Sequence, residues 1–319
     1  MRVLVTGSAG FIGFHLSKLL LKKKYQVIGV DNLNKYYDVN LKKKRNQILK
    51  KYKNYTFYKT DIKKKNSLEK IFKKHKIACI VNLAAQAGVR YSLINPQAYI
   101  DSNILGFFNI IECAKKNNIK KLIYASTSSI YGLQNKYPIK EDFNTDKPIQ
   151  LYAATKKSNE VIAHAYSHLF KIQTIGLRFF TVYGPWGRPD MALFKFTKNI
   201  IKGKKIDVFN RGNHVRDFTF VEDVAEAVFR IIRDKNKKKI YKIYNVGNGK
   251  KIKLLEYIKI IEKYLKKKSK KNYLALQKGD VIKTHCNNNL LKKDYKFKPT
   301  KNVKYGIKIF LEWFLSYYK

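Results

Sequence analysis

A glycine-rich run lies between a short apolar segment and an amphipathic one near the start of the chain. Residues Arg2–Val5 have the composition of a β-strand, and the run TGSAGFIG at residues 6–13 leads from them into a helix-like segment. Glycine at such a turn permits a tight bend and lets backbone N–H groups approach a pyrophosphate. The spacing Gly-x-x-Gly-x-x-Gly is one residue longer at its first interval than the common dinucleotide fingerprint. Its place between a strand and a helix predicts a dinucleotide-binding turn.

Short apolar runs alternate with amphipathic segments through the first half of the chain. Repeated β-α alternation is typical of a parallel sheet with helices on both faces, and right-handed crossovers then give a doubly wound, Rossmann-type α/β fold. We expect strands at Val3–Thr6, Gln26–Asp31, Thr56–Thr60, Ala78–Ala84, Lys121–Ser126 and Gln173–Arg178, and helices at Ile12–Lys22, Asn66–Lys74, Asn103–Asn117 and Ala153–Phe170.

The rhythm changes after about residue 179, where loops with glycine, proline and tryptophan precede shorter elements. We therefore predict a dinucleotide-binding domain at residues 1–178 and a smaller mixed domain for the substrate at residues 179–319. Phe218–Ile232 has the pattern of a short strand and a helix, so a segment around residues 216–233 is expected to rejoin the first domain. Lys266–Lys271 has the composition of a basic link or surface loop.

The net charge of +46 comes almost entirely from lysine. The lysines are spread along the whole chain and accompany abundant asparagine, isoleucine and tyrosine, which indicates compositional drift. Arginine, the residue preferred for bidentate recognition of phosphates and bases, is scarce. We expect no specific nucleic-acid partner, although non-specific binding to polyanions at low salt follows from the charge.

Other classes of protein are disfavoured by what the sequence lacks. No basic, apolar leader precedes the first strand and no run of about 18 apolar residues occurs, so we expect a cytoplasmic protein without a membrane span. Cys79, Cys113 and Cys286 are too widely spaced for a zinc motif or a disulfide framework. His164 and His168 are one helical turn apart but lack the glutamate of a metalloprotease helix, and we predict no metal site.

Two aspartates follow predicted strands at the edge where a dinucleotide binds. Asp31 ends the second strand, where a carboxylate accepts hydrogen bonds from the adenosine ribose and repels a 2′-phosphate. This favours NAD over NADP, although Asp31 could instead cap the turn with Asn32. Asp61 follows the third strand, within reach of the adenine amino group.

Tyr152 and Lys156 begin a predicted helix in the run YAATK, where their spacing places both on one helical face. A tyrosine that acts as a base near neutral pH needs its pKa lowered by roughly 3 units, about 4 kcal/mol. A nearby ammonium and a positive nicotinamide favour the phenolate. The run STSSIYG at residues 126–132 brings hydroxyls to the same sheet edge, and Thr127 is the candidate to bind the reacting hydroxyl of a substrate. Ser126 could instead satisfy a buried loop.

These motifs resemble the extended short-chain dehydrogenases that act on nucleotide sugars, and most closely the UDP-glucuronate 4-epimerases. The resemblance covers essentially the whole chain. It is carried by DNLN and YYD at residues 31–38, AAQAGVRYS at 84–92, RFFTVYGP at 178–185 and RPDMA at 188–192.

The resemblance implies that NAD accepts hydride from the sugar C4 while Tyr152 takes the proton of the 4-hydroxyl. The transient 4-keto sugar turns over and is reduced on its other face, so NAD stays bound. The implied catalytic residues are Tyr152, Lys156 and Thr127. NAD is held by Gly7, Gly10, Phe11, Ile12, Gly13, Asp31, Asn32, Asp61, Ile62, Leu83, Ala84, Ala85, Tyr152 and Lys156. The UDP-sugar is held by Arg90, Thr127, Ser128, Ser129, Thr181, Arg188, Arg216, Gln277 and Asp280.

Several alternatives remain open at this point. Arg188 could bind the uronate carboxylate or pair with Asp190 at the surface, and Arg216 could bind phosphate or pair with Asp217 or Glu222. The sugar could be an N-acetylhexosamine or its uronic acid. Related dehydratases and decarboxylases carry a carboxylate where Ser128 and Ser129 stand. An alcohol dehydrogenase that releases NADH, or a catalytically silent NAD-binding or RNA-binding protein, would keep the same fold. The resemblance also implies a homodimer formed through Asn103–Asn117 and Ala153–Phe170.

Overall fold

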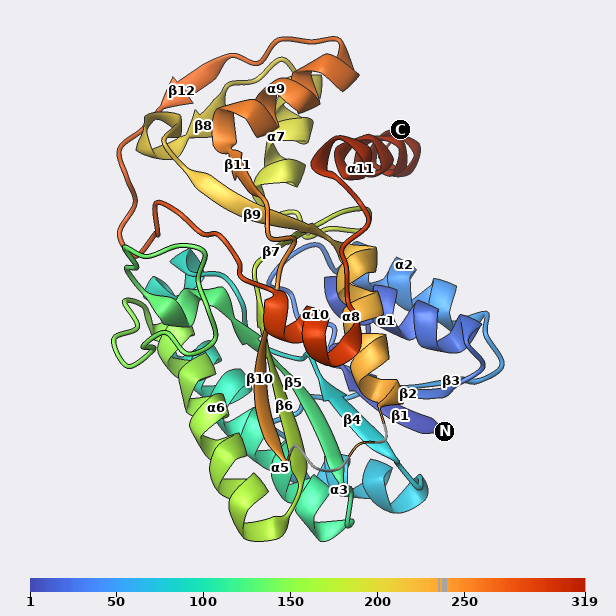
Figure 1. The fold of residues 1–319 in the computed structure, drawn as a ribbon. Helices are drawn as coiled ribbons and strands as arrows, with labels where there is room; N and C mark the ends of the chain where they lie inside the picture. Colours follow the sequence, from blue (N-terminus) through green and yellow to red (C-terminus); the bar gives the residue numbers. More distant parts are fainter. Residues whose placement is uncertain (235, 237–239, 319) are drawn as a thin grey trace.

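The computed structural model describes residues 1–234, 236 and 240–318. Within these residues the centre is a seven-stranded sheet, wholly parallel, with the order β10-β6-β5-β4-β1-β2-β3 (Figure 1). A chain that starts in the middle of a sheet and builds outward in both directions makes the Rossmann-type doubly wound fold, so the predicted fold class is confirmed. The strands are β1 (Arg2–Thr6), β2 (Gln26–Asp31), β3 (Tyr55–Lys59), β4 (Cys79–Asn82), β5 (Lys121–Thr127), β6 (Gln173–Phe179) and β10 (Tyr241–Val246).

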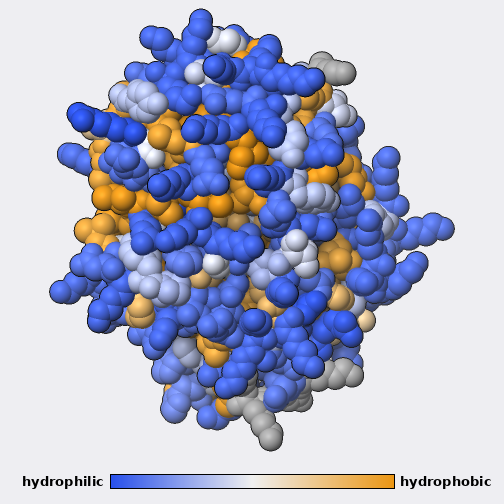
Figure 2. Space-filling view, turned by 45° about the horizontal axis from the view of Figure 1, so that its top comes forward, coloured by the Kyte–Doolittle hydropathy of each residue, from blue (hydrophilic) through white to orange (hydrophobic). Residues whose placement is uncertain are grey.

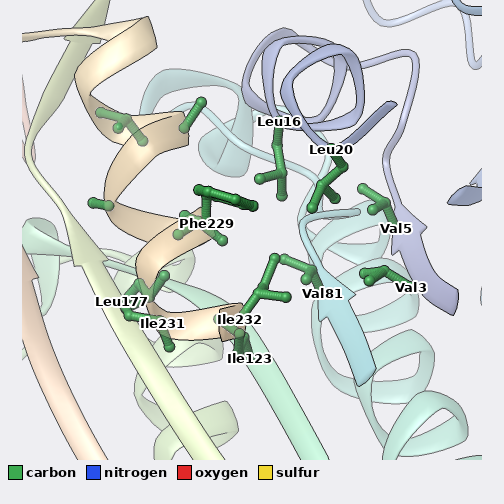
Figure 3. Close-up of a cluster of buried hydrophobic side chains, with 14 of the residues drawn as sticks. Val3, Val5, Leu16, Leu20, Val81, Ile123, Leu177, Phe229, Ile231 and Ile232 are labelled. Carbon is green, nitrogen blue, oxygen red and sulfur yellow. The ribbon is translucent and has the colours of Figure 1, made fainter. Parts of the chain in front are cut away.

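Helices cover both faces of this sheet because its strands are apolar on both sides. Val3 and Val5 of β1 pack with helices on one face, whereas Leu4 packs on the other. Figure 3 shows the first of these cores, in which Leu16 and Phe229 lie over the strands. The first face carries α1 (Phe11–Lys22), α2 (Val39–Lys50), α8 (Val221–Arg233) and α10 (Asn289–Tyr295), and the second carries α3 (Lys65–Lys74), α5 (Gly106–Lys116) and α6 (Leu151–Phe170).

A smaller unit with its own aromatic core lies beyond the carboxyl ends of the parallel strands (Figure 1). Phe194, Tyr257 and Phe310 are buried in this core. Its sheets are β11-β9-β7 and β12-β8. The elements are β7 (Thr181–Tyr183), α7 (Ala192–Ile201), β8 (Ile206–Val208), β9 (Val215–Phe220), β11 (Lys251–Lys253), α9 (Leu254–Leu265), β12 (Lys271–Tyr273) and α11 (Val303–Tyr317).

The chain returns from the smaller unit to the large sheet through α8. Within the segment at residues 216–233 only α8 makes this return, because β9 stays in the three-stranded sheet. Strand β10 then adds an edge to the large sheet, which the sequence pattern did not indicate. The division at residue 178 stays a prediction.

Two predicted elements differ from those observed. The strand expected at Ala78–Ala84 is shorter, because the backbone after Asn82 leaves the sheet. The helix expected at Asn103–Asn117 begins earlier and changes type: α4 (Gln97–Tyr99) leads into the π-helical η2 (Ile100–Leu105) and then α5. The described residues also form three short 3₁₀ segments: η1 (Arg90–Leu93), η3 (Ser128–Tyr131) and η4 (Phe209–Gly212).

The surface reflects the lysine-rich composition. Figure 2 shows one face covered largely by hydrophilic side chains, with an apolar band across it. None of the helices in the described part of the chain is long and apolar enough to cross a membrane.

Candidate active site

A cavity of about 370 Å³ lies at the carboxyl ends of the parallel strands, where ligands bind in folds of this kind. The glycine turn, the loops after β2 to β6, the start of α6 and the segment after β7 line it. All the residues predicted to hold the cofactor are among its walls: Gly7, Gly10, Phe11, Ile12, Gly13, Asp31, Asn32, Asp61, Ile62, Leu83, Ala84, Ala85, Tyr152 and Lys156. Of the predicted substrate residues, the walls include Thr127, Ser128, Ser129, Thr181 and Arg188.

The glycine turn is too tight for larger residues and leaves the start of α1 open. Gly7 has φ +68°, and a Cβ there would lie 2.8 Å from the backbone nitrogen of Ala84. A Cβ at Gly13 would lie 2.0 Å from the Gly7 carbonyl oxygen. Among the described residues no side chain caps α1, and its first turn carries no acidic residue. The free N–H groups at this helix end suit a pyrophosphate, so the turn fits a dinucleotide.

Asp31 both lines the cavity and closes the turn that follows β2. One of its carboxylate oxygens accepts a hydrogen bond from the Leu33 N–H (2.8 Å), and the other accepts one from the Ala9 N–H (3.1 Å). Burial raises its pKa, while these hydrogen bonds and the charges of Lys42 and Arg45 oppose the rise. The capping alternative is therefore observed, but it leaves the carboxylate at the cavity wall.

Tyr152 and Lys156 lie one turn apart at the start of α6, beside the end of β5. The Tyr152 hydroxyl hydrogen bonds with Thr127, whose oxygen also accepts from the Ser129 N–H at 3.2 Å. Burial raises the pKa of Tyr152, whereas the Thr127 hydrogen bond and the charge of Arg188 lower it. Burial also lowers the pKa of Lys156 to about 8, against the opposing charge of Glu160.

A buried ion pair fixes the other side of α6. The Arg178 guanidinium binds both carboxylate oxygens of Glu160 at 2.9 and 2.8 Å, and the two side chains are 6% and 4% exposed. The Ser126 hydroxyl donates to the same carboxylate at 2.6 Å. The Ser126 hydroxyl is therefore bonded to Glu160 of this ion pair, on α6, and not to a buried loop.

Arg188 lines the cavity and pairs with Asp190, which is not among the lining residues. Its Nε and Nη2 atoms donate to the two carboxylate oxygens at 3.0 and 2.5 Å. The Tyr36 hydroxyl donates to the same carboxylate at 3.2 Å, and its ring lies against the guanidinium. Burial raises the pKa of Asp190, but the charge of Arg188 and the hydrogen bonds from Arg188 and Tyr36 together outweigh burial, so the net pKa is lowered. The predicted alternative pair thus exists, but it is half-buried rather than at the surface, and its arginine lines the cavity.

The remaining predicted substrate residues lie outside the cavity wall. Arg216 pairs with Asp280 at 2.9 Å, and not with Asp217 or Glu222 as its alternative interpretation proposed. Gln277 has a buried side-chain oxygen without a hydrogen-bond partner among the described residues. Arg90 is exposed and lies over the ring of Phe209, 4.4 Å from its centroid.

Comparisons with known proteins agree with this geometry. The model of the "NAD dependent epimerase/dehydratase family" matches residues 3–247. The chain belongs to this family. Its cofactor is therefore NAD, as predicted. The protein CapI of Staphylococcus aureus is 50% identical over all of both chains, and UDP-glucuronate 4-epimerase 4 of Arabidopsis thaliana is 44% identical over 99% of this chain and 76% of the plant protein. The crystal structure of a Bacillus cereus UDP-glucuronic acid 4-epimerase, in complex with UDP-glucuronic acid and NAD, superposes with a TM-score of 0.94 at 32% identity over 99% of each chain.

Several polar residues of this epimerase-family site were not predicted, among them Lys42, Tyr36 and Asn159. Lys42 lines the cavity from α2, and its ammonium donates to the backbone and side-chain oxygens of Asn34 at 2.8 and 2.5 Å. Tyr36 also lines it, and Asn159 contacts Lys156. Asn159 follows Lys156 by one helical turn, a spacing that the sequence already contains. Lys42 is one of many lysines and carries no such signal.

Proposed function

We propose that the protein catalyses the NAD-dependent 4-epimerisation of UDP-glucuronate to UDP-galacturonate through a transient 4-keto sugar. The proposal rests on one observation: the residues predicted to bind the cofactor, to transfer the proton and to bind the uronate carboxylate line the same cavity. The glycine turn, the Tyr152–Thr127 pair, Arg188 and Thr181 all line it. The chain's similarity to UDP-glucuronate 4-epimerases supports the same substrate.

Tyr152 accepts the proton of the sugar 4-hydroxyl and later returns it. NAD held by the glycine turn and Asp31 would supply a hydride acceptor and a positive charge to the site. Burial alone raises the pKa of Tyr152, so positive neighbours are needed to make it a base. Lys156 supplies one such charge from one turn along α6. Thr127 orients the reacting hydroxyl, since its own hydrogen bond with Tyr152 places it at the point of proton transfer.

Arg188 and Thr181 suit the uronate carboxylate, because a carboxylate that leaves water must be paired and hydrogen-bonded. Asp190 engages Nε and Nη2 of Arg188, which leaves Nη1 outside this pair. The carboxylate of the sugar then binds at Nη1 and at the Thr181 hydroxyl. Holding it in the plane of the ring disfavours decarboxylation of the keto sugar, since the bond to carbon dioxide stays out of line with the keto π-system.

The UDP group is assigned to the residues outside the cavity wall. Arg216 offers a guanidinium for phosphate, and its partner Asp280 suits ribose hydroxyls. The unpartnered oxygen of Gln277 offers an acceptor. The Arg90 guanidinium lies over the Phe209 ring, and the two side chains together could flank the nucleotide of the substrate.

A homodimer is proposed from apolar side chains left exposed on two neighbouring helical segments. Leu105 and Phe108 lie on η2 and α5, and Val161 and Leu169 lie on α6; all four are between 41% and 65% exposed. A two-fold interface would bury this surface. Sedimentation at micromolar protein should give a dimer, and Val161→Glu should give a monomer. A parent protein that sediments as a monomer at that concentration contradicts the proposal. A cytoplasmic location and the lack of a specific nucleic-acid partner stay predictions.

The product spectrum tests the function. The protein is incubated with UDP-glucuronate, UDP-glucose and UDP-N-acetylglucosamine without added NAD, and the products are identified by NMR. We expect a mixture of UDP-glucuronate and UDP-galacturonate, with the other sugars converted far more slowly. A dehydrated sugar or a UDP-pentose as the main product would contradict it. We expect neither product, because the cavity carries Ser128 and Ser129 where the related dehydratases and decarboxylases have a carboxylate.

A further inference from the structure

The Lys156 ammonium is buried and has few partners. The side chain is 2% exposed, so water cannot solvate its charge. Among the described residues one side chain accepts a hydrogen bond from Nζ, the amide oxygen of Asn159 at 3.3 Å. Glu160 attracts the charge from the same helix, but its two oxygens are engaged by Arg178. Asn159 is therefore the direct acceptor for this ammonium.

The orientation of the Asn159 amide is fixed by a second contact. Its nitrogen donates to the backbone carbonyl oxygen of Asn103 at 2.6 Å. A carbonyl oxygen only accepts hydrogen bonds, so the amide nitrogen must face Asn103 and the amide oxygen must face Lys156. The inverted amide would set an NH₂ group against the ammonium and two oxygens against each other. Asn103 thus determines what Asn159 presents to the lysine.

Asn103 is itself held from two sides within the π-helical η2. Its side-chain oxygen accepts from the Gln86 N–H at 2.8 Å, and its nitrogen donates to the Gln86 carbonyl and to the Thr155 hydroxyl, both at 3.0 Å. Asn103 is 1% exposed. A π-helical turn is rare and is often found at functional sites. Here it presents a backbone carbonyl to α6 from a rigid position.

We propose that Asn159 is a positioning residue, through which η2 holds the Lys156 ammonium in the orientation that Tyr152 needs. This inference rests on the proposed epimerase function. The other groups that face the pair are Glu160 on α6 with its partner Arg178 on β6, Arg188 from the segment after β7, and Tyr99 on α4, whose ring lies edge-on to that of Tyr152. None of these replaces the amide as the acceptor for Nζ.

The pH dependence of turnover separates positioning from a merely structural role. The ammonium is present below its pKa and lost above it, so activity falls on the alkaline side as Lys156 loses its proton. In Asn159→Leu the ammonium has no acceptor, its pKa falls below about 8, and the alkaline limb should move at least about one pH unit lower. Asn159→Asp restores an acceptor, and its limb should return to or pass that of the parent. Ser158→Ala removes only a hydroxyl bonded to the Ala154 carbonyl and should leave the profile unchanged.

A direct titration of Lys156 makes the test independent of the reaction. Proteins labelled with ¹³C at the lysine ε-carbon are titrated by NMR, and the Lys156 signal is identified by its loss in Lys156→Met. We expect a lower pKa in Asn159→Leu and a higher one in Asn159→Asp. If the leucine variant does not fold, the aspartate variant decides, since an unchanged pKa there overturns the inference. Equal loss of activity at every pH, with both limbs in place, also overturns it. Shifted pKa values in a protein that epimerises no UDP-sugar would support Asn159 and reject only the proposed function.

Discussion

Replacing Arg188 by alanine should remove the preference for a uronic acid. A hydrogen bond to a charged group contributes about 1.5–3 kcal/mol, which corresponds to a loss of roughly 10- to 150-fold in kcat/KM for each bond to the substrate carboxylate. Neutral UDP-glucose forms no such bond. Its residual conversion should change by less than about threefold, within the scale of a few tenths of a kcal/mol.

The structure adds a second term to this variant, because Asp190 loses its partner. Arg188 now holds the pKa of Asp190 below its usual range against the effect of burial. Without the guanidinium, the Asp190 carboxylate faces the incoming uronate, and the two like charges repel. The single variant therefore loses the attraction between Arg188 and the uronate carboxylate, and it also gains a repulsion between that carboxylate and Asp190. The double variant Arg188→Ala/Asp190→Ala removes the repulsion and should recover part of the activity on UDP-glucuronate, but not that of the parent protein.

The assay compares kcat/KM for UDP-glucuronate and UDP-glucose in the parent, Arg188→Ala, Asp190→Ala and the double variant. The reasoning requires the ratio between the two sugars to fall in both variants that lack Arg188. Equal losses on both sugars would refute it, since Arg188 would then support the fold of the cavity wall. A double variant weaker on UDP-glucuronate than Arg188→Ala would refute the repulsion.

Three further predictions test other parts of the site. Tyr152→Phe should lower turnover by about 10²–10⁴-fold with bound NAD retained, because only the proton acceptor is lost; activity within threefold of the parent, measured by product NMR, rejects the role. The parent should bind NAD far better than NADP, as measured by calorimetry. Asp31→Ala should reduce the ratio of the two dissociation constants by about tenfold, or about 1.4 kcal/mol. Equal affinity of the parent for both cofactors would show that the carboxylate does not face the ribose. Arg178→Leu should lower the free energy of unfolding by about 3–5 kcal/mol, a fall in Tm of roughly 5–10 °C by calorimetry, because Glu160 is left buried and unpaired. The double variant Arg178→Leu/Glu160→Leu should be more stable than the single variant, and the opposite order rejects the explanation.

The parts of the fold that the sequence predicted depend on local patterns. The glycine turn at Gly7–Gly13 and the apolar strands around it combine turn chemistry with periodicity, both of which are readable over a few residues. Helix α2 was missed because its buried residues include Lys42, Arg45 and Asn46, so no apolar stripe marks it. Arg45 is fully buried, and its guanidinium binds the carbonyl oxygens of Ala9 and Trp186. The burial of such a residue depends on partners that are distant in the chain, which a local pattern does not reveal.

The candidate site divides in the same way. Tyr152 and Lys156 were predicted because one helical turn separates them, and Thr127 because it ends a strand. The contact of Asn159 with Asn103 joins segments far apart in sequence, and it depends on a π-helical turn that no local pattern indicates. Arg188 and Asp190 are near neighbours in the chain, but only the tertiary structure shows that the paired Arg188 lines the cavity.

The central claim is that the sugar is oxidised and reduced at C4 within one binding event, with Tyr152 handling the proton. It is tested most directly with UDP-glucuronate that carries deuterium at C4, incubated with the protein in ordinary water without added NAD. The account predicts UDP-galacturonate that retains deuterium at C4, because the same hydride is returned to the opposite face. Product in which C4 carries hydrogen from the solvent, or release of reduced cofactor without epimerised sugar, would contradict it.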